Sequence, residues 1–221
     1  MVIDETPHGM AVMTQSLVFA MLWTMLSMLG PNDPSQTPTI AYEMKTQATL
    51  CGPLFIPKYD NMVDDTIKEM GEKEENIIFD SRLAWHFVPK SFKIYMYVDV
   101  DTATERIFND KGRVSESYSD MATAKKEIIE RRESEVLRYK TFYNIDINNF
   151  KNYDFIIDTS HATKDEVNEA VLSNFKAFEK GEAYDRILLS PKNLIIENDA
   201  ENDASDDIEI EKRDGKFYVL K

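Results

Sequence analysis

The residue types best suited to phosphate chemistry in this chain are one Asp-Ser-Arg triplet and a small set of arginines. Asp80, Ser81 and Arg82 directly follow the apolar run 77–79. An Asp at the end of a strand can orient Mg²⁺ or its water ligands, and an Arg two residues later can form a bidentate contact with a phosphate or a base edge. An ordinary loop ion pair between the two side chains would explain the same triplet, and the local sequence leaves both interpretations open.

The arginine set occupies a later, highly charged stretch of the chain. Phosphoryl transfer requires positioned cations around the migrating negative charge. Arg131 and Arg138 are seven residues apart, so they share one face of a helix. The alternative is a solvated face in which arginines pair with neighbouring glutamates. The residues concerned are Arg106, Arg113, Arg131, Arg132 and Arg138, with Glu127, Glu130, Glu133 and Glu135 as the acidic neighbours.

The elements that would position these side chains alternate between strand and helix. Apolar runs predict strands at 76–79, 93–98 and 155–157, and periodic patterns predict helices at 62–70, 101–109, 123–142 and 164–179. The third of these helices has Ile128, Ile129, Val136 and Leu137 mostly on one face, and Asp99 or Asp101 is the expected N-cap of the second. The alternation predicts an α/β fold, a three-layer arrangement of a parallel sheet flanked by helices, with ligands at the carboxyl ends of the strands.

Composition restricts the classes of partner. The formal net charge of −14 argues against binding a nucleic acid polymer, although it allows a small nucleotide. Cys51 is the single cysteine, which excludes a disulfide within the chain and agrees with a reducing, cytoplasmic location. No metal site is predicted, because the three histidines lack ligand spacing and the acidic run 197–211 lacks the Gly and Glu of a calcium loop.

Three segments differ in composition. Residues 1–58 contain the uncharged, Met-rich run 10–29 and then five prolines between 31 and 58. We expect 10–29 to form a helix that is buried or faces a protein partner, with a membrane anchor as the alternative. Residues 59–180 carry the regular alternation of elements, and residues 181–221 form a tail with an acidic linker.

Five sequence blocks in one order resemble the cytidylate-kinase-like family of P-loop nucleoside monophosphate kinases. They are NIIFDSRLAWHFVP (76–89), KIYMYVDV (93–100), ERIFNDKGR (105–113), ERRESEVLRYKTFYNID (130–146) and YDFIIDTS (153–160). The resemblance implies phosphoryl transfer from Mg-ATP to a nucleoside monophosphate, CMP or dCMP. It also implies site roles for individual residues. Asp80 and Arg82 would meet the monophosphate, Arg106 and Arg113 would begin a lid over ATP, and Arg131 and Arg138 would clamp the phosphates being joined.

The chain departs from the family at its start. The family opens with a strand, a Gly-rich loop that ends in Gly-Lys-Ser/Thr, and a helix, and that loop holds the phosphates. Here Gly9 is the only glycine in residues 1–16, and Lys45 is the first lysine. The alternative function is therefore that of a non-catalytic pseudokinase, which binds a nucleotide or a protein partner.

The tail resembles pieces of a ParB-like module. The segments concerned are YDRILLSPKNL (184–194) and IEIEKRDGKFYVLK (208–221). From these pieces we expect at most two strands.

Overall fold

The computed structural model describes residues 11–14, 39–42, 57–73, 77–110, 118–197 and 209–220. They belong to two compact units. The first unit comprises residues 1–96, 152–157 and 162–188, and the second comprises residues 97–151, 158–161 and 189–221.

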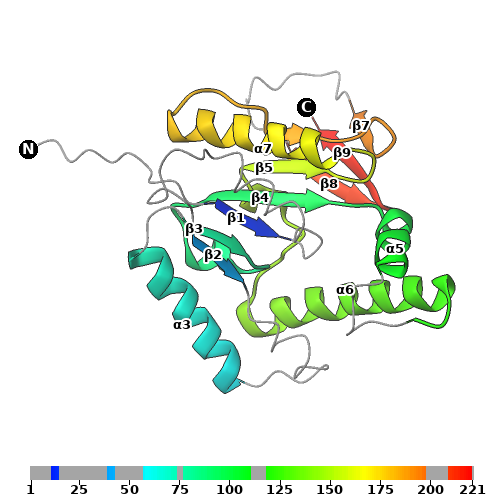
Figure 1. Ribbon diagram of the computed structural model, residues 1–221, viewed down its shortest axis with the longest axis horizontal. Helices are drawn as coiled ribbons and strands as arrows, with labels where there is room; N and C mark the ends of the chain where they lie inside the picture. The colour runs from blue at the N-terminus through cyan, green and yellow to red at the C-terminus, as the bar shows by residue number, and fades with distance from the viewer. Residues whose placement is uncertain are drawn as a thin grey trace, which may run out of the picture. The chain divides into compact units, whose positions relative to one another are not determined.

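The main sheet has six strands in the order β2-β3-β1-β4-β5-β6. Their bounds are β1 Ala11–Thr14, β2 Thr39–Tyr42, β3 Ile77–Asp80, β4 Phe92–Tyr97, β5 Phe155–Asp158 and β6 Ile187–Leu188. The pairs β1–β3, β1–β4, β2–β3 and β5–β6 are all parallel. Figure 1 shows this sheet with helices beside it, and the predicted α/β architecture is confirmed.

Strand β1 corrects the prediction for residues 10–29. Ala11 pairs with Ile78 on one side and with Phe92 on the other, so residues 11–14 form a central strand and the predicted helix is wrong there. A central parallel strand is apolar on both faces, and a short apolar run of this kind cannot be told from a buried helix by periodicity. Residues 15–29 lie outside the described residues. Among the described helices, none is long and apolar enough to cross a membrane.

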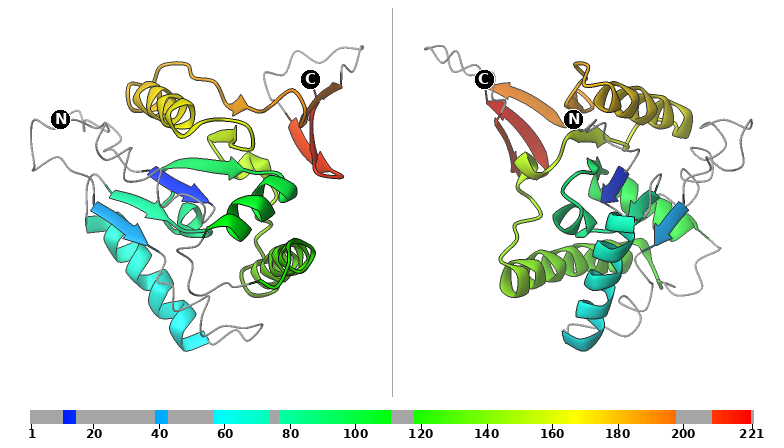
Figure 2. Two further views of the ribbon diagram at one scale, coloured as in Figure 1. Left: turned by 45° about the vertical axis from the view of Figure 1, so that its right-hand side comes forward. Right: turned by 90° about the vertical axis from the view of Figure 1, so that its left-hand side faces the viewer.

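Helices cover the sheet of the first unit on both sides. Figures 1 and 2 show α3 (Pro57–Lys73) and α7 (Lys164–Glu179) on opposite sides of the strands. Val167 and Val171 of α7 belong to a buried cluster with strand residues such as Phe92 and Phe155. The predicted bounds and apolar face of α7 are confirmed.

The start of α7 is explained by the local sequence. The Thr163 hydroxyl accepts a hydrogen bond from the Glu166 amide at 3.3 Å, and the Thr163 amide donates to the Glu166 carboxylate at 2.7 Å. This reciprocal capping box satisfies amides that have no partner within the helix. It explains why the helix begins at Lys164.

A glycine permits close packing of α3 against the short helix α4 (Ala84–Phe87) and the residue that follows it. A Cβ on Gly71 would lie 2.8 Å from Cγ2 of Val88, which is 4% exposed. A glycine in a helix interior costs about 1 kcal/mol relative to alanine. The close approach to Val88 explains why the helix contains one at this point.

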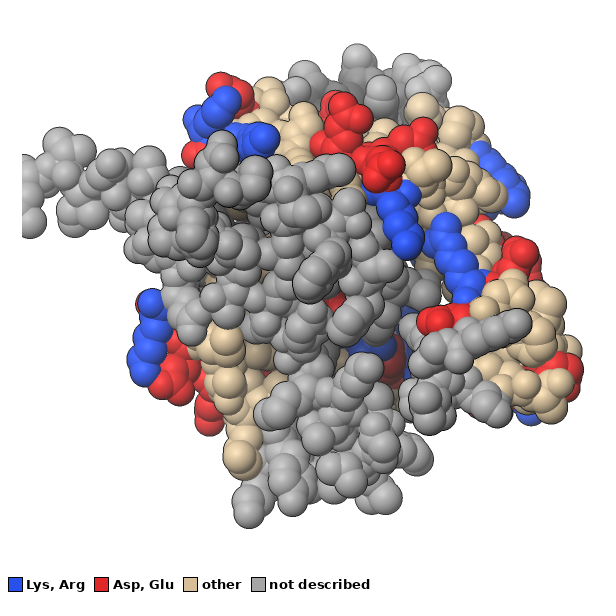
Figure 3. Space-filling model, viewed as in Figure 1, with Lys and Arg blue, Asp and Glu red and all other residues tan. Residues whose placement is uncertain are grey.

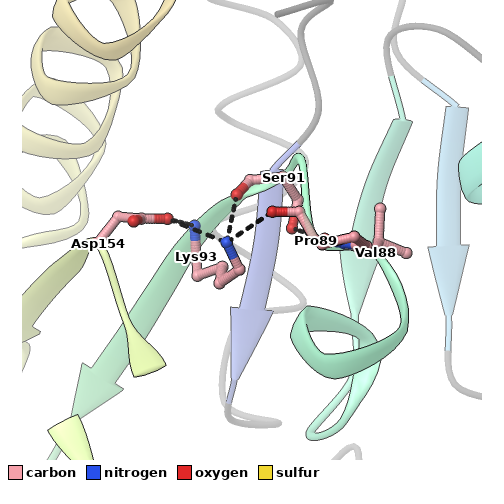
Figure 4. Close-up of polar contacts among 5 residues, drawn as sticks. All are labelled: Val88, Pro89, Ser91, Lys93 and Asp154. Atoms are coloured by element: carbon pink, nitrogen blue, oxygen red, sulfur yellow. Dashed lines mark hydrogen bonds and ion pairs between the residues drawn. The ribbon is translucent and has the colours of Figure 1, made fainter. Parts of the chain in front are cut away.

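Lys93 and Asp154 fix the register of β4 against β5 within the first unit (Figure 4). The Lys93 amide donates to the Asp154 carboxylate at 2.7 Å, and the Asp154 amide donates to the Lys93 carbonyl at 2.8 Å. The Lys93 ammonium donates to the carbonyls of Pro89 and Ser91 at 2.9 and 3.1 Å. These charged side chains lie where β4 and β5 begin. They therefore stabilise the pairing of the strands and do not belong to a site at the carboxyl edge of the sheet.

The second unit contains α5 (Val100–Asn109), α6 (Met121–Tyr143) and a three-stranded sheet. The strands are β7 Leu194–Glu197, β8 Glu209–Arg213 and β9 Lys216–Leu220, in the order β7-β9-β8. A short 3₁₀ helix, Phe150–Asn152, precedes β5. The tail holds β6 as well as these three strands, so the expectation of at most two strands is wrong.

The apolar residues of α6 do not form the single buried face that their spacing predicts. Ile129 and Leu137 are 39% and 68% exposed, and the buried residues of the helix are Ala124 and Tyr139. Only Ile128 and Val136 of the predicted set are half-buried. The helix contacts its own unit chiefly through α5, which leaves part of its apolar surface in solvent.

On the face in Figure 3, both Lys and Arg and Asp and Glu side chains are visible among the described residues. The division of the chain near residues 58 and 180 stays a prediction, although β1 and β2 pair with β3 in one sheet.

Candidate functional site

Asp80 ends a strand that is paired on both sides. It is opposite Met13 of β1 and Tyr42 of β2 in the register of the parallel sheet. Ile77, Ile78 and Phe79 before it are buried, whereas Asp80 is half-buried. The strand thus delivers one carboxylate to its carboxyl end, the position that ligands favour in parallel sheets.

Ser81 shapes the turn that follows Asp80. Its hydroxyl accepts hydrogen bonds from the amides of Leu83 and Ala84 at 3.3 and 3.2 Å. The side chain therefore satisfies two amides at the start of α4, a local bond that favours a turn over a continued strand. The turn fixes the backbone between Asp80 and Arg82.

The backbone of Arg82 is tied to an aromatic cluster. The Trp85 indole nitrogen donates to the Arg82 carbonyl at 3.0 Å. The Trp85 ring centroid is 5.6 Å from that of Tyr153, which is 5.0 Å from that of Tyr95. All three rings are buried, so the backbone of Arg82 is hydrogen-bonded to a residue of a packed aromatic cluster. The Arg82 residue itself is half-buried.

In the second unit, Asp99 caps α5. Its carboxylate accepts from the Thr102 amide at 2.9 Å and from the Thr102 hydroxyl at 2.8 Å. Partial burial acts to raise the pKa of Asp99, but the hydrogen bonds from Thr102 and Ser160 outweigh it and hold the pKa below its usual range. Asp99 is confirmed as the N-cap, and Asp101 lies in the first turn.

Arg106 binds backbone oxygens of the loop after β5. Its Nη2 donates to the Thr159 carbonyl at 2.7 Å and to the Ser160 carbonyl at 3.3 Å. The Thr159 amide and hydroxyl both donate to the Tyr97 carbonyl, at 2.8 and 2.9 Å. In this structure Arg106 thus connects α5 to the loop, and the residue as a whole remains exposed.

Asp158 organises a buried polar network. One carboxylate oxygen accepts from the Ser160 amide at 2.9 Å. The other accepts from the Asn193 side-chain amide at 2.6 Å and from the Ser190 backbone amide at 3.3 Å. Asp158 is 6% exposed, so its role is to hold the segment that leads into β7.

The arginines of α6 differ in exposure. Arg131 is exposed, whereas Arg138 is half-buried and its guanidinium donates to the Tyr139 hydroxyl at 3.3 Å. Both lie on α6, as predicted, and helix geometry puts them on one face. Arg113 lies outside the described residues. Arg106, Arg131 and Arg138 belong to the second unit, and Asp80 and Arg82 belong to the first.

An open pocket of about 370 Å³ lies in the second unit between the beginnings of α5 and α6. Its lining combines acids and bases, and Lys125 pairs with Asp101 at 2.5 Å. The residues that line it are Asp99, Asp101, Thr102, Thr104, Glu105, Met121, Ala122, Lys125 and Lys192. Among the residues that the structure describes, no group of three or more potential ligands could hold a metal ion.

The parallel sheet flanked by helices is consistent with an α/β fold of the nucleoside monophosphate kinase type. A model of the cytidylate kinase-like family matches residues 27–161. The chain belongs to this family.

Several curated relatives match about half of this chain. A cytidylate kinase of Methanoregula boonei is 32% identical over 126 residues, which cover 56% of this chain and 66% of the relative. One of Archaeoglobus fulgidus is 34% identical over 117 residues, with coverages of 52% and 62%. An S-adenosylmethionine-dependent nucleotide dehydratase of Lacinutrix mariniflava is 31% identical over 120 residues, 54% of this chain and 24% of that protein. The chain thus matches less than two thirds of the length of each.

A solved structure supports the fold. An uncharacterized protein from Eubacterium ventriosum superposes with a TM-score of 0.56 at 13% identity, over 77% of this chain and 99% of that one. At this identity the likeness concerns the fold alone.

Sequence reasoning missed the anchoring role of Asp158 and its partner Asn193. The Asp-x-Ser spacing of Asp158 and Ser160 signals a local turn. No local pattern signals Asn193, because its bond to Asp158 closes a long loop.

Proposed function

We propose that this protein transfers a phosphoryl group from Mg-ATP to a nucleoside monophosphate, with CMP or dCMP as the acceptor. The observation that carries the proposal is the turn after β3, where Asp80 ends a strand paired on both sides and Ser81 fixes the backbone that leads to Arg82. Relatives named cytidylate kinases are 32% and 34% identical to this chain over 126 and 117 residues. Asp80 and Arg82 would bind the acceptor nucleotide.

Arginines of α5, of α6 and of the sequence between them would bind the phosphates. Arg131 and Arg138 would stabilise the charge that develops during transfer, since positioned cations are the main contribution a protein makes to this reaction. Arg106 and Arg113 would belong to the lid that closes over ATP and excludes water. For Arg106 this role requires that its contacts with the Thr159 and Ser160 carbonyls leave part of the guanidinium for ATP.

A second candidate is nucleotide binding without turnover. Residues 1–44 contain no Lys or Arg, although the end of β1 is where the family's phosphate loop would begin. ATP phosphates would therefore depend on cations from elsewhere in the chain. This observation favours a protein that binds the acceptor nucleotide but does not transfer a phosphoryl group to it.

Calorimetric titration of the full chain with CMP, and separately with Mg-ATP, distinguishes the two candidates. Binding of both ligands together with formation of CDP supports the kinase. Binding of CMP without Mg-ATP supports the non-catalytic binder. Failure to bind either ligand contradicts both candidates.

The roles of individual residues are tested by comparing CMP with cytidine. We expect Arg82→Gln, Arg131→Ala and Arg138→Ala each to lower the affinity for CMP about tenfold and to leave cytidine affinity nearly unchanged, because each removes a charge-assisted contact to phosphate. Lys90→Gln and Lys140→Ala remove exposed cations nearby in sequence and serve as controls. Unchanged CMP affinity in both α6 variants would contradict the assignment of Arg131 and Arg138 to the phosphates.

A further inference from the structure

The C-terminal tail packs within the second unit through an aromatic cluster. Phe217 of β9 is fully buried, with its ring centroid 4.6 Å from that of Tyr97 and 5.2 Å from that of Phe150. The Tyr97 hydroxyl donates to the Gly215 carbonyl at 2.9 Å. Residues 189–221 lie beyond the region that the family model matches, whereas Tyr97 and Phe150 lie inside it. The packing therefore joins a segment outside the family match to residues within it.

Asn193 extends this connection from β9 to the end of β5. Its backbone amide donates to the Ser190 carbonyl at 2.8 Å, and its backbone carbonyl accepts from the Phe217 amide at 2.8 Å. Its side-chain nitrogen donates to the Asp158 carboxylate at 2.6 Å. Asn193 is 6% exposed, so water has little access to these bonds. The residue links the tail strand to a buried carboxylate of the family region.

The hydrogen bonds continue from Asp158 into the loop after β5. The second oxygen of the Asp158 carboxylate accepts from the Ser160 amide at 2.9 Å. The Ser160 hydroxyl in turn accepts from the Asp99 amide at 2.8 Å, directly before α5. Asp158, Thr159 and Ser160 are each at most 8% exposed. A close-packed interior transmits a displacement instead of absorbing it, so the position of Asp158 determines the position of the loop carbonyls.

Arg106 binds the two carbonyls of this loop through one nitrogen. Its Nη2 donates to the Thr159 carbonyl at 2.7 Å and to the Ser160 carbonyl at 3.3 Å. A guanidinium has five N–H donors in a rigid plane, so the donors on Nη1 and Nε lie outside these two bonds. Because the plane is rigid, the loop carbonyls fix the direction in which the remaining donors point.

We propose that Asn193 is a positioning residue for Arg106, and that the C-terminal tail thereby contributes to binding the phosphates of Mg-ATP. The inference rests on the proposed role of Arg106 toward ATP. Asn193 touches no ligand and acts through Asp158 and the loop carbonyls. Asn193, Asp158, the loop and Arg106 all belong to the second unit. The bond from Asn193 is the shortest of those described for the Asp158 carboxylate, and hydrogen bonds to a charged group are the strong ones.

The first test needs no nucleotide. NMR of the full chain measures how fast the guanidinium hydrogens of Arg106 exchange with water. Asn193→Ala removes the donor to Asp158 and should accelerate this exchange about threefold or more, because the loop carbonyls are no longer held in place. Asn193→Gln keeps an amide on a longer side chain and should have a smaller effect. Lys216→Gln, at an exposed position of the same tail, is the control. Exchange rates equal to those of the unmodified chain in both Asn193 variants would overturn the proposal.

The second test is a double-mutant cycle read by titration with Mg-ATP. We expect Asn193→Ala and Arg106→Gln each to lower the affinity for Mg-ATP about tenfold. The double variant should bind no more weakly than Arg106→Gln alone, because Asn193 acts through Arg106. CMP affinity should stay unchanged in Asn193→Ala, since Asp80 and Arg82 belong to the other unit. Independent losses that add in the double variant, or an equal loss of CMP affinity, would show a general structural effect and contradict the positioning role.

The two tests separate this inference from the proposed function. If the unmodified chain does not bind Mg-ATP, the assignment of Arg106 to ATP fails, and the exchange rates still decide whether the tail positions the Arg106 guanidinium. If the unmodified chain binds Mg-ATP and Asn193→Ala binds it equally well, the proposed function stands and the contribution of the tail is refuted.

Discussion

Arg106 has a structural role in this protein, because its side chain holds two backbone carbonyls of a neighbouring loop. Its guanidinium holds the carbonyls of Thr159 and Ser160 and so connects α5 to the loop after β5. We expect Arg106→Gln to lower the free energy of unfolding by about 1 kcal/mol, a value reduced by solvent exposure. Urea denaturation measures this loss, and Lys140→Gln, an exposed cation on α6, should show none.

Asp158 should contribute more to the free energy of unfolding than Arg106, because Asp158 is buried. Asp158→Asn places an amide opposite the Asn193 amide group and weakens the bonds from Ser160 and Ser190. We expect a loss of about 2 kcal/mol. Hydrogen exchange should also accelerate at the Ser190 amide. Asp185→Asn, at an exposed position, is the control, and equal effects of the two variants would contradict the anchoring role.

Residue-scale roles were predictable where the contact is local. Asp99 caps α5 through a residue three positions later, so its sequence context was sufficient. Asp158 and Asn193 are brought together only by the fold of the second unit, so their pairing left no trace in either local sequence. The assignments of Asp80, Arg82, Arg131 and Arg138 to a ligand stay predictions.

Helix α7 carries two buried asparagines in opposite situations. The Asn174 side chain donates to the Ala170 carbonyl at 2.9 Å and accepts from the Asp185 amide at 3.0 Å. Asn168 is fully buried, and within the described part of the chain neither of its polar side-chain atoms has a hydrogen-bond partner. A buried amide without partners costs stability.

We therefore expect opposite effects from one substitution at these two sites. Asn168→Leu should raise the free energy of unfolding by about 1 kcal/mol, and Asn174→Leu should lower it by about 2 kcal/mol. Denaturant titration of both variants gives the comparison. A large loss in Asn168→Leu would show that this amide serves an interaction outside the described residues.

At the element scale, the spacing of apolar residues predicted the buried face of α7 correctly and overstated the burial of α6. It did not identify β1 as a strand. Residues of α7 have one buried and one exposed face, so the apolar spacing was enough to predict its bounds. Helix α6 leaves Ile129 and Leu137 in solvent, so its pattern overstated its burial. Strand β1 is central and apolar, which removes the alternation that would have distinguished it from a helix.

At the scale of the whole molecule, the C-terminal hairpin of β8 and β9 packs within the second unit. Phe217→Ala removes a fully buried ring that contacts Tyr97 and Phe150, and we expect a loss of about 3–5 kcal/mol. Hydrogen exchange should show reduced protection in α5 and α6 as well as in β9. Tyr218→Ala, at a half-buried position of the same strand, should have a smaller effect. If protection falls in β9 alone, the hairpin is an independent appendage.

The parallel sheet with its helices was predictable from the sequence, whereas the packing of the C-terminal tail against the rest of the second unit was not. Alternating strands and helices between residues 76 and 179 were enough to predict a parallel sheet. The tail's attachment depends on Tyr97, Phe150 and Asp158, which lie far from it in the chain and carry no pattern that points to it.

The position of β1 has a consequence for protein synthesis. In the sheet this strand is hydrogen-bonded on both sides, to β3 and β4, and both partners are translated after it. A nascent chain that ends before residue 77 therefore presents an apolar strand with two unpaired edges, the kind of segment that associates with other chains. Ribosome stalling between β2 and β3 should thus yield aggregation-prone fragments, whereas stalling after β4 should not.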